Sequence, residues 1–198
     1  TFVALVYGRL RHRWQVPLAL PRPAELAPFL RVGWALWIPV EPVSDSLAYH
    51  AFATNIADHG VYGWTPDEPT AYWAVGTAAI YAAGYLLFGT GSALSVVLIN
   101  LISSLAVIWF LNDLGRRWFG PRTGLIAATL FALWPLAIQF TTVLASEVHF
   151  MALSLAFLAA WDRSALTRRG LMLLLLAGAA LAAATYVRPI ALLMPAAL

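Results

Sequence analysis

The sequence predicts an all-α fold: a polytopic transmembrane helical bundle with interfacial (juxtamembrane) helices in its first outer loop. Hydrophobic residues make up 62% of the chain and charged residues only 11%, and the mean hydropathy is +0.78. Soluble domains are about 45–50% apolar and about 25% charged. A water-soluble fold of 198 residues has no means of hiding so much apolar surface, so lipid must be the solvent for most of the chain.

The N-terminal part of the chain reads as a basic segment followed by a first span. Residues 1–25 are rich in arginine and proline, and we predict that they are cytoplasmic. Residues 26–43 are apolar enough for a transmembrane helix that ends at Pro39 and Pro42. Arg31 lies near the start of this helix, and we expect its side chain to extend back to the basic side of the membrane.

Residues 44–93 are predicted to be a polar outer loop with juxtamembrane helices, among them the apolar stretch 72–89. Beyond this loop, apolar stretches alternate with short connections, so the chain is expected to form one membrane domain. The predicted transmembrane helices 2 to 5 are 94–113, 124–143, 148–161 and 171–187. The predicted connections are a cytoplasmic loop at 114–123, an outer turn at 144–147, a cytoplasmic loop at 162–170, and 188–198, an outer turn leading into the next apolar helix.

Arginine positions predict the orientation of these spans. If 72–89 crossed the membrane, the basic loops 9–22 and 116–122 would lie on opposite sides, against the positive-inside bias. If 72–89 lies in the interface or packs as a re-entrant element instead, ten of the twelve arginines share one face. We therefore predict that the arginine-rich loops are cytoplasmic. The chain begins with Thr1 rather than Met and stops inside an apolar run, so we expect a fragment of a longer protein.

Two acids on the predicted outer face, Asp45 and Glu147, are the catalytic candidates. Asp45 follows the first span and Glu147 lies between two later ones. A carboxylate held at a helix end on the membrane–water boundary can take a proton from a hydroxyl or bind a metal. The alternatives are a solvated acid or helix cap for Asp45, and a favourable interaction with a helix dipole for Glu147.

Arg188 is the one arginine that emerges on the predicted outer face. Its planar guanidinium suits a phosphate leaving group or a carboxylate, while the alternative is an interface anchor. Tyr49, His50, Tyr72 and His149 complete the substrate-binding candidates. No cofactor is predicted with certainty, and a divalent metal held by Asp45 and Glu147 stays open.

Several classes of chemistry are excluded or lack a signal. The chain has no cysteine, so no disulfide, thiolate nucleophile or Cys-based metal site exists in it. It has no P-loop, dinucleotide fingerprint or HExxH motif. The basic pI reflects loop arginines that set orientation, so no nucleic-acid partner is predicted. Asp67 and Glu68 are adjacent in a proline-rich turn and are expected to be solvated.

An ordered set of short motifs covers the chain from about residue 40 to 195. It comprises Ser44-Asp45-Ser46 with Tyr49 and Ala53, Pro69-x-x-Tyr72-Trp73, Phe88-Gly89, Arg116-Arg117-Trp118-Phe119-Gly120, Pro135, Ser146-Glu147 and Arg188-Pro189. In this set the chain resembles the C-type (GT-C fold) polytopic membrane glycosyltransferases. It is most similar to the branch that holds dolichyl-phosphate-mannose protein mannosyltransferases and the bacterial aminoarabinose–lipid A transferase.

The resemblance implies transfer of a sugar from a polyprenyl-phosphate donor to a glycan, lipid or protein acceptor on the periplasmic face of a bacterial inner membrane. In that family the first outer loop carries a catalytic acid and juxtamembrane helices. By position, Asp45 would be the base or a metal ligand, Glu147 the second outer acid, and Arg188 a donor-phosphate contact. Two alternatives stay open, namely a lipid-linked glycan transporter or flippase, and a non-catalytic membrane subunit.

Overall fold

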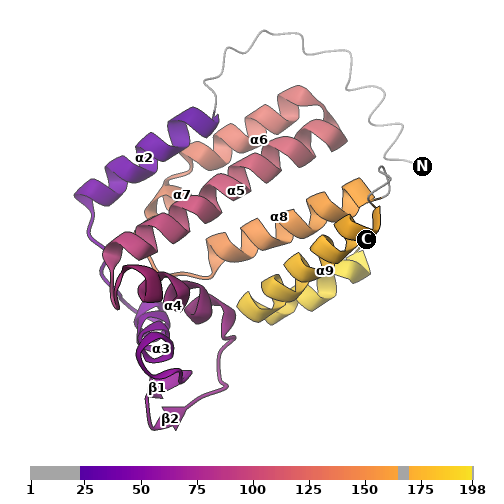
Figure 1. Ribbon diagram of the computed structural model, residues 1–198. Coiled ribbons are helices and arrows are strands. Elements are labelled where there is room, and N and C mark those ends of the chain that lie inside the picture. Colours follow the sequence, from indigo (N-terminus) through magenta and orange to yellow (C-terminus); the bar gives the residue numbers. More distant parts are fainter. Residues whose placement is uncertain (1–22, 165–169, 198) are drawn as a thin grey trace.

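The computed structural model describes residues 23–164 and 170–197, and in that part of the chain the structure is a helical bundle with a small helical cap at one end (Figure 1). The bundle helices are α2 (Pro23–Trp37), α5 (Ala93–Phe119), α6 (Pro121–Leu133), α7 (Pro135–Gln139), α8 (Glu147–Ser164) and α9 (Gly170–Val187), followed by the 3₁₀ helix η1 (Pro189–Ala197). The cap consists of α3 (Asp45–His59), the antiparallel strands β1 (Gly63–Thr65) and β2 (Glu68–Pro69), and α4 (Gly76–Phe88). The predicted all-α fold is confirmed.

The length of two helices and the apolar surface of the bundle suit a lipid bilayer. Among the described helices, α5 and α9 are long and apolar enough to cross a membrane. Large apolar side chains such as Leu171 and Leu175 stand mostly exposed on α9, as expected for a surface that faces lipid. The bundle core between α2, α5, α6, α7 and α8 is rich in alanine, and small residues let membrane helices approach closely. The protein is therefore an integral membrane protein.

The cap lies at one end of the bundle, as Figure 1 shows, where α2 finishes and α5 begins. Helix α4 has 13 residues, so it is about 20 Å long, shorter than the roughly 30 Å hydrocarbon core. It packs on α3, on α5 and on the end of α9. From the cap, α5 runs to the opposite end of the bundle, α6 returns, α8 runs away again and α9 returns. The part of the predicted interfacial stretch 72–89 that is helical thus belongs to the cap.

Several helix ends differ from those predicted by hydropathy. Helix α2 stops at Trp37, before Pro39, whereas a span over 26–43 was predicted. Helix α5 continues into the predicted loop 114–123, and α8 continues into the predicted loop 162–170. Hydropathy falls where the first charged residues appear, but a helix continues through charges that find partners. The membrane sides assigned to these segments stay a prediction.

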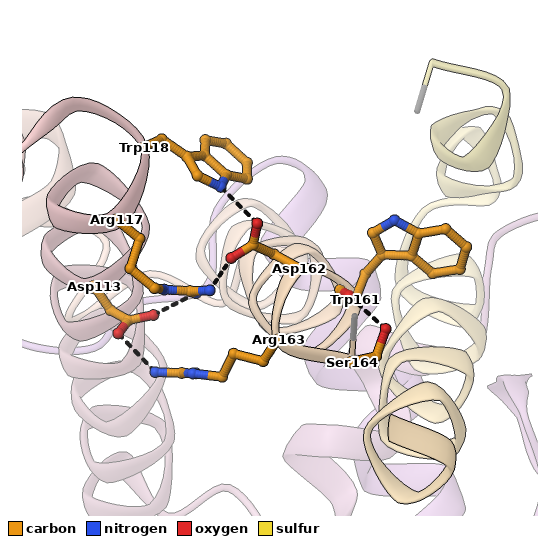
Figure 2. A network of polar contacts seen from close by, with 7 residues as sticks. All are labelled: Asp113, Arg117, Trp118, Trp161, Asp162, Arg163 and Ser164. Carbon is orange, nitrogen blue, oxygen red and sulfur yellow. Dashed lines mark hydrogen bonds and ion pairs between the residues drawn. The ribbon is translucent and has the colours of Figure 1, made fainter. Parts of the chain in front are cut away.

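A network of charged side chains provides those partners (Figure 2), toward the ends of α5 and α8 that lie away from the cap in Figure 1. The Asp113 carboxylate accepts from Arg117 at 2.7 Å and from Arg163 at 2.6 Å. Arg117 also pairs with Asp162, and Trp118 Nε1 donates to Asp162 at 3.0 Å. All four charged side chains are partly buried, so solvent screens them less than surface pairs. The network joins the C-terminal turns of α5 and α8.

Arg31 lies inside the bundle. Its guanidinium is fully buried and donates to Ser104 Oγ at 2.6 Å and to the carbonyl oxygens of Ala132 at 3.1 Å and Phe131 at 3.4 Å. These carbonyls end α6, and because Pro135 has no N–H, the Phe131 carbonyl lacks its usual helical donor. A cation suits such a helix C-terminus. The expectation that Arg31 extends back to the basic side is therefore wrong.

The predicted span 124–143 is broken at the same place. Helix α6 ends at Leu133 and the short α7 begins at Pro135, after which residues 140–146 are irregular up to the start of α8. Irregular backbone at such a position needs hydrogen-bond partners from the protein, because lipid offers none. Trp34 of α2 supplies one contact by donating from Nε1 to Thr142 Oγ1 at 3.0 Å.

Helices α5 and α6 form a tight hairpin through two glycines. A Cβ added to Gly124 would lie 2.4 Å from the Asn112 carbonyl oxygen, and one added to Gly115 would lie 2.6 Å from the Gly124 Cα. Both distances are far below van der Waals contact and involve backbone atoms that cannot rotate away. The close approach of the two helices therefore depends on glycine at these positions.

Gly124→Ala is expected to lower the free energy of unfolding by about 1–3 kcal/mol, the usual cost of overpacking. Gly178→Ala is the matched control, because Gly178 also lies in a helix but a Cβ there would meet nothing within 4 Å. Denaturant titration of the protein in detergent micelles measures both. Equal stability of the two variants would contradict the close-packed hairpin.

Candidate active site

Asp45 is the first residue of α3, and its side chain is exposed. Ser44 precedes it with a φ of 52°, the one positive φ outside glycine in the described part of the chain. The Val43 N–H donates to Ser46 Oγ at 2.6 Å, and the Ser46 hydroxyl lies 2.7 Å from the Val43 carbonyl oxygen, which closes the turn. Backbone held in such a conformation costs about 1–3 kcal/mol and occurs preferentially at functional sites.

The turn leaves the Asp45 carboxylate available. Ser44 occupies the position before the first turn of α3, so the alternative reading of Asp45 as the helix cap does not hold. Within the described residues Asp45 makes no hydrogen bond or ion pair. An exposed, unpaired carboxylate on a rigid helix end is free to accept a proton from an incoming hydroxyl.

Tyr49 and His50 lie one turn further along α3 and are half-buried against other parts of the cap. The Tyr49 ring lies 5.2 Å from the Trp73 ring, and His50 Nδ1 lies 2.8 Å from the Tyr85 hydroxyl. Burial lowers the pKa of His50 below its ordinary value of 6.5 and so favours the neutral imidazole, which can accept a hydrogen bond from the Tyr85 hydroxyl. Both side chains thus join α3, the helix that begins with Asp45, to other parts of the cap.

The Tyr72 side chain is 87% exposed and makes no hydrogen bond or ring contact within the described residues. Asp67 and Glu68 are also exposed, in the β1–β2 hairpin, as expected for a solvated turn. In the described part of the chain, no hydrogen bond or ion pair joins any of these three residues to Glu147 or Arg188.

Glu147 and Arg188 form an ion pair, with Arg188 Nη2 2.5 Å from Glu147 Oε1. Arg188 Nε also donates to Ser146 Oγ at 2.8 Å, and the guanidinium carbon lies 5.9 Å from the Phe150 ring centroid. The pair joins the first turn of α8 to the residue that follows α9. Both side chains are about 40% exposed, so protein covers neither of them fully and an anion can reach the guanidinium.

His149 is buried in the first turn of α8, two residues after Glu147. Its Nδ1 lies 2.8 Å from Ser103 Oγ and its Nε2 lies 3.1 Å from the Tyr81 hydroxyl, and the residue is 2% exposed. Tyr81 also donates to Asn100 Oδ1 at 2.8 Å. His149 was predicted to bind substrate; the structure places it in a buried network that supports the start of α8.

Sequence reasoning missed Tyr81, Asn100, Ser103 and the role of Ser146. A signal was present for Asn100, since an amide in the middle of an apolar span is rare and requires a partner. The partner itself was not readable, because the segment that Asn100 contacts is about forty residues away in the sequence.

The metal alternative receives no support from the side chains that are placed. Over residues 23–164 and 170–197, no group of three or more His, Asp or Glu side chains is arranged to hold a metal ion. Within the same residues no hydrogen bond or ion pair joins Asp45 to Glu147, and His50 and His149 both bond to hydroxyl groups.

Comparison with known proteins identifies the family. The model of the family described as dolichyl-phosphate-mannose-protein mannosyltransferase matches residues 69–198, about two thirds of the chain. The match includes Glu147, His149 and Arg188, and it begins after Asp45. No curated protein and no solved structure matches the chain. The chain belongs to this family and is a membrane glycosyltransferase of the GT-C type, which confirms the resemblance inferred from its motifs.

Proposed function

We propose that this member of the dolichyl-phosphate-mannose-protein mannosyltransferase family transfers a sugar from a polyprenyl-phosphate donor to an acceptor hydroxyl at the cap end of the bundle. The observation that carries the proposal is the half-exposed Arg188, held by Glu147 and Ser146 within the matched region. A planar guanidinium at the boundary between protein and solvent suits the phosphate of a donor whose lipid tail stays in the bilayer.

The proposed reaction needs a base and a stabilised leaving group. Asp45 takes the proton of the acceptor hydroxyl, and the hydroxyl oxygen attacks the anomeric carbon of the sugar. The bond between that carbon and the phosphate oxygen breaks, so the polyprenyl phosphate leaves with the bonding electrons. Arg188 stabilises the negative charge that develops on this phosphate, and Glu147 orients Arg188.

The shared core of the cap supports a joint site. Tyr49 lies one turn after Asp45 and packs against a buried hydrophobic cluster. Leu144, three residues before Glu147, is a member of that cluster. The arginines of α5, α6 and α8 lie at the opposite end of the bundle, where Figure 2 shows Arg117 and Arg163. The positive-inside bias then favours a periplasmic cap in a bacterial inner membrane.

The full-length protein in proteoliposomes is expected to convert a radiolabelled polyprenyl-phosphate sugar and an acceptor into free polyprenyl phosphate and a new glycoside. A panel of donor sugars and of glycan, lipid and protein acceptors identifies the pair. A nucleotide sugar is the matched control, and it should give no product because it lacks the lipid. Movement of the donor across sealed vesicles without a new glycosidic bond would instead identify a flippase and would reject the proposal.

A further inference from the structure

We infer that Tyr81 of α4 is a positioning residue for the Glu147–Arg188 pair, although it touches neither side chain. The inference rests on the proposed function for what the pair does, but its structural basis is independent of that function. Tyr81 is fully buried, and its hydroxyl lies at the centre of contacts from α5, α8 and the irregular segment 140–146. Helix α4 thus reaches the base of α8 from the cap.

One assignment of the protons satisfies every group around Tyr81. In this assignment His149 carries its proton on Nε2 and donates to the Tyr81 oxygen at 3.1 Å, and Ser103 donates to His149 Nδ1 at 2.8 Å. The Tyr81 hydroxyl proton then goes to Asn100 Oδ1 at 2.8 Å. The Tyr81 oxygen also accepts the Ala145 N–H at 3.1 Å. In this arrangement both nitrogens of His149 and the hydroxyl of Tyr81 are satisfied, which is what a buried network requires.

The network holds the irregular segment that leads into α8. Asn100 Nδ2 donates to the carbonyl oxygens of Val143 at 3.0 Å and Thr141 at 3.3 Å, while Tyr81 takes the Ala145 N–H. These backbone groups lie outside helices, and buried groups of this kind cost free energy unless they are paired. Asn100 and Tyr81 therefore hold the part of the segment next to α8, while Trp34 contacts it at Thr142.

The conformation of this segment determines where Ser146 and Glu147 meet Arg188. Ala145 is followed directly by Ser146 and Glu147, whose side chains both contact Arg188. Loss of the Ala145 bond would free the backbone at the residue before Ser146. Both partners of Arg188 would then become less well placed, and a poorly placed catalytic contact is costly.

Helix α4 also contacts the other side of the pair. A Cβ added to Gly76, the first residue of α4, would lie 2.5 Å from the Tyr186 carbonyl carbon and 2.7 Å from the Val187 nitrogen. These atoms belong to the two residues that precede Arg188 in the chain. A single short helix thus holds the backbone before Glu147 through Tyr81 and the backbone before Arg188 through Gly76. We take α4 to be the element that sets how the two residues meet.

Tyr81→Phe tests the inference with Tyr85→Phe as the matched control. Both tyrosines are buried in α4, one turn apart, but the Tyr85 hydroxyl contacts His50 of α3. In hydrogen–deuterium exchange on the full-length protein, Tyr81→Phe is expected to speed exchange across 141–147 about tenfold. Tyr85→Phe is expected to leave that segment protected. Equal protection in both variants, or an equal loss in both, would overturn the inference.

A second variant covers the case in which Tyr81→Phe does not fold. Gly76→Ala leaves the Tyr81 hydroxyl in place and disturbs the contact with α9. It is expected to speed exchange across 184–188 at least severalfold while 141–147 stays protected. Unchanged exchange across 184–188 would reject the role assigned to α4 on that side.

Sugar-transfer kinetics test whether the effect of Tyr81 on the Glu147–Arg188 pair matters for the reaction. If the wild type transfers sugar, Tyr81→Phe is expected to raise the donor KM about tenfold and leave the acceptor KM unchanged, because the pair faces the donor phosphate. A merely structural role would lower the amount of folded protein and leave the donor KM of the remaining enzyme unchanged. If the wild type transfers no sugar, the proposed function fails, and the exchange experiment still decides the role of Tyr81.

Discussion

Replacing Asp45 with asparagine in the full-length protein is expected to lower kcat for sugar transfer by about 10²- to 10⁴-fold, the range that general-base catalysis contributes. Asparagine keeps the shape of the side chain and removes the group that accepts the proton. The amount of folded protein should not change, because Asp45 is exposed and makes no hydrogen bond or ion pair within the described residues. Radiolabelled transfer in proteoliposomes measures the rate, and detergent-solubilised yield measures folding.

Asp58→Asn is the matched control for this experiment. Asp58 lies on the same helix, α3, and its carboxylate accepts from Thr90 at 2.5 Å. It is expected to retain transfer close to the wild-type rate. Unchanged turnover of Asp45→Asn would remove Asp45 from the role of base. Equal losses in both variants would indicate that the charge of α3, rather than a specific carboxylate, supports transfer.

The general form of the bundle was predictable because it depends on composition along the chain. Apolar stretches alternate with arginine-rich connections, and this pattern alone indicates helices that pass back and forth. The arginine distribution also predicted that 72–89 does not behave as a span. In the structure α4 is short and packs at the cap. Such features need no knowledge of which side chains meet.

Contacts between distant segments could not be predicted in the same way. Arg31 looked like an arginine that returns to the membrane surface, yet it donates to two carbonyl oxygens about a hundred residues away, in the last turn of α6. For one of them, that of Phe131, Pro135 cannot supply the usual helical N–H. Tyr81 looked like one of several aromatic residues in an apolar stretch, and its partners lie at Asn100, Ala145 and His149. Hydropathy does not record which buried polar groups pair, because the pairing is set by tertiary packing.

The candidate site also has features that the sequence predicted and features that depend on tertiary packing. The sequence singled out Asp45, Glu147 and Arg188 as acids and a cation on one predicted face, and the structure joins Glu147 to Arg188. It also shows that Asp45 follows a residue with a positive φ, a feature with no sequence signature, because serine rarely adopts it. The assignment of His149 rested on its proximity to Glu147 in the sequence, and the structure shows it buried against Ser103 and Tyr81.

Replacing Arg188 with glutamine is expected to lower kcat/KM for the donor by about 10²- to 10³-fold, the cost of removing one group that stabilises a developing anion. Arg188→Lys should recover only part of this loss, because an ammonium keeps the charge but lacks the planar fork that meets Ser146 and Glu147 together. Initial rates at varied donor concentration measure the effect. The acceptor KM serves as an internal control and should not change.

A charge exchange separates this catalytic role from a structural one. The variant Glu147→Arg with Arg188→Glu can restore an ion pair between α8 and the end of α9, so its stability should exceed that of Glu147→Arg alone. Transfer should stay as low as in Arg188→Gln, because a carboxylate at position 188 repels the donor phosphate. Recovery of transfer in the exchanged variant would show that only the ion pair matters and would contradict a phosphate contact by Arg188. Loss of stability with no recovery would show that the pair also depends on Ser146, whose hydroxyl accepts from arginine but has no such donor when position 188 holds a glutamate.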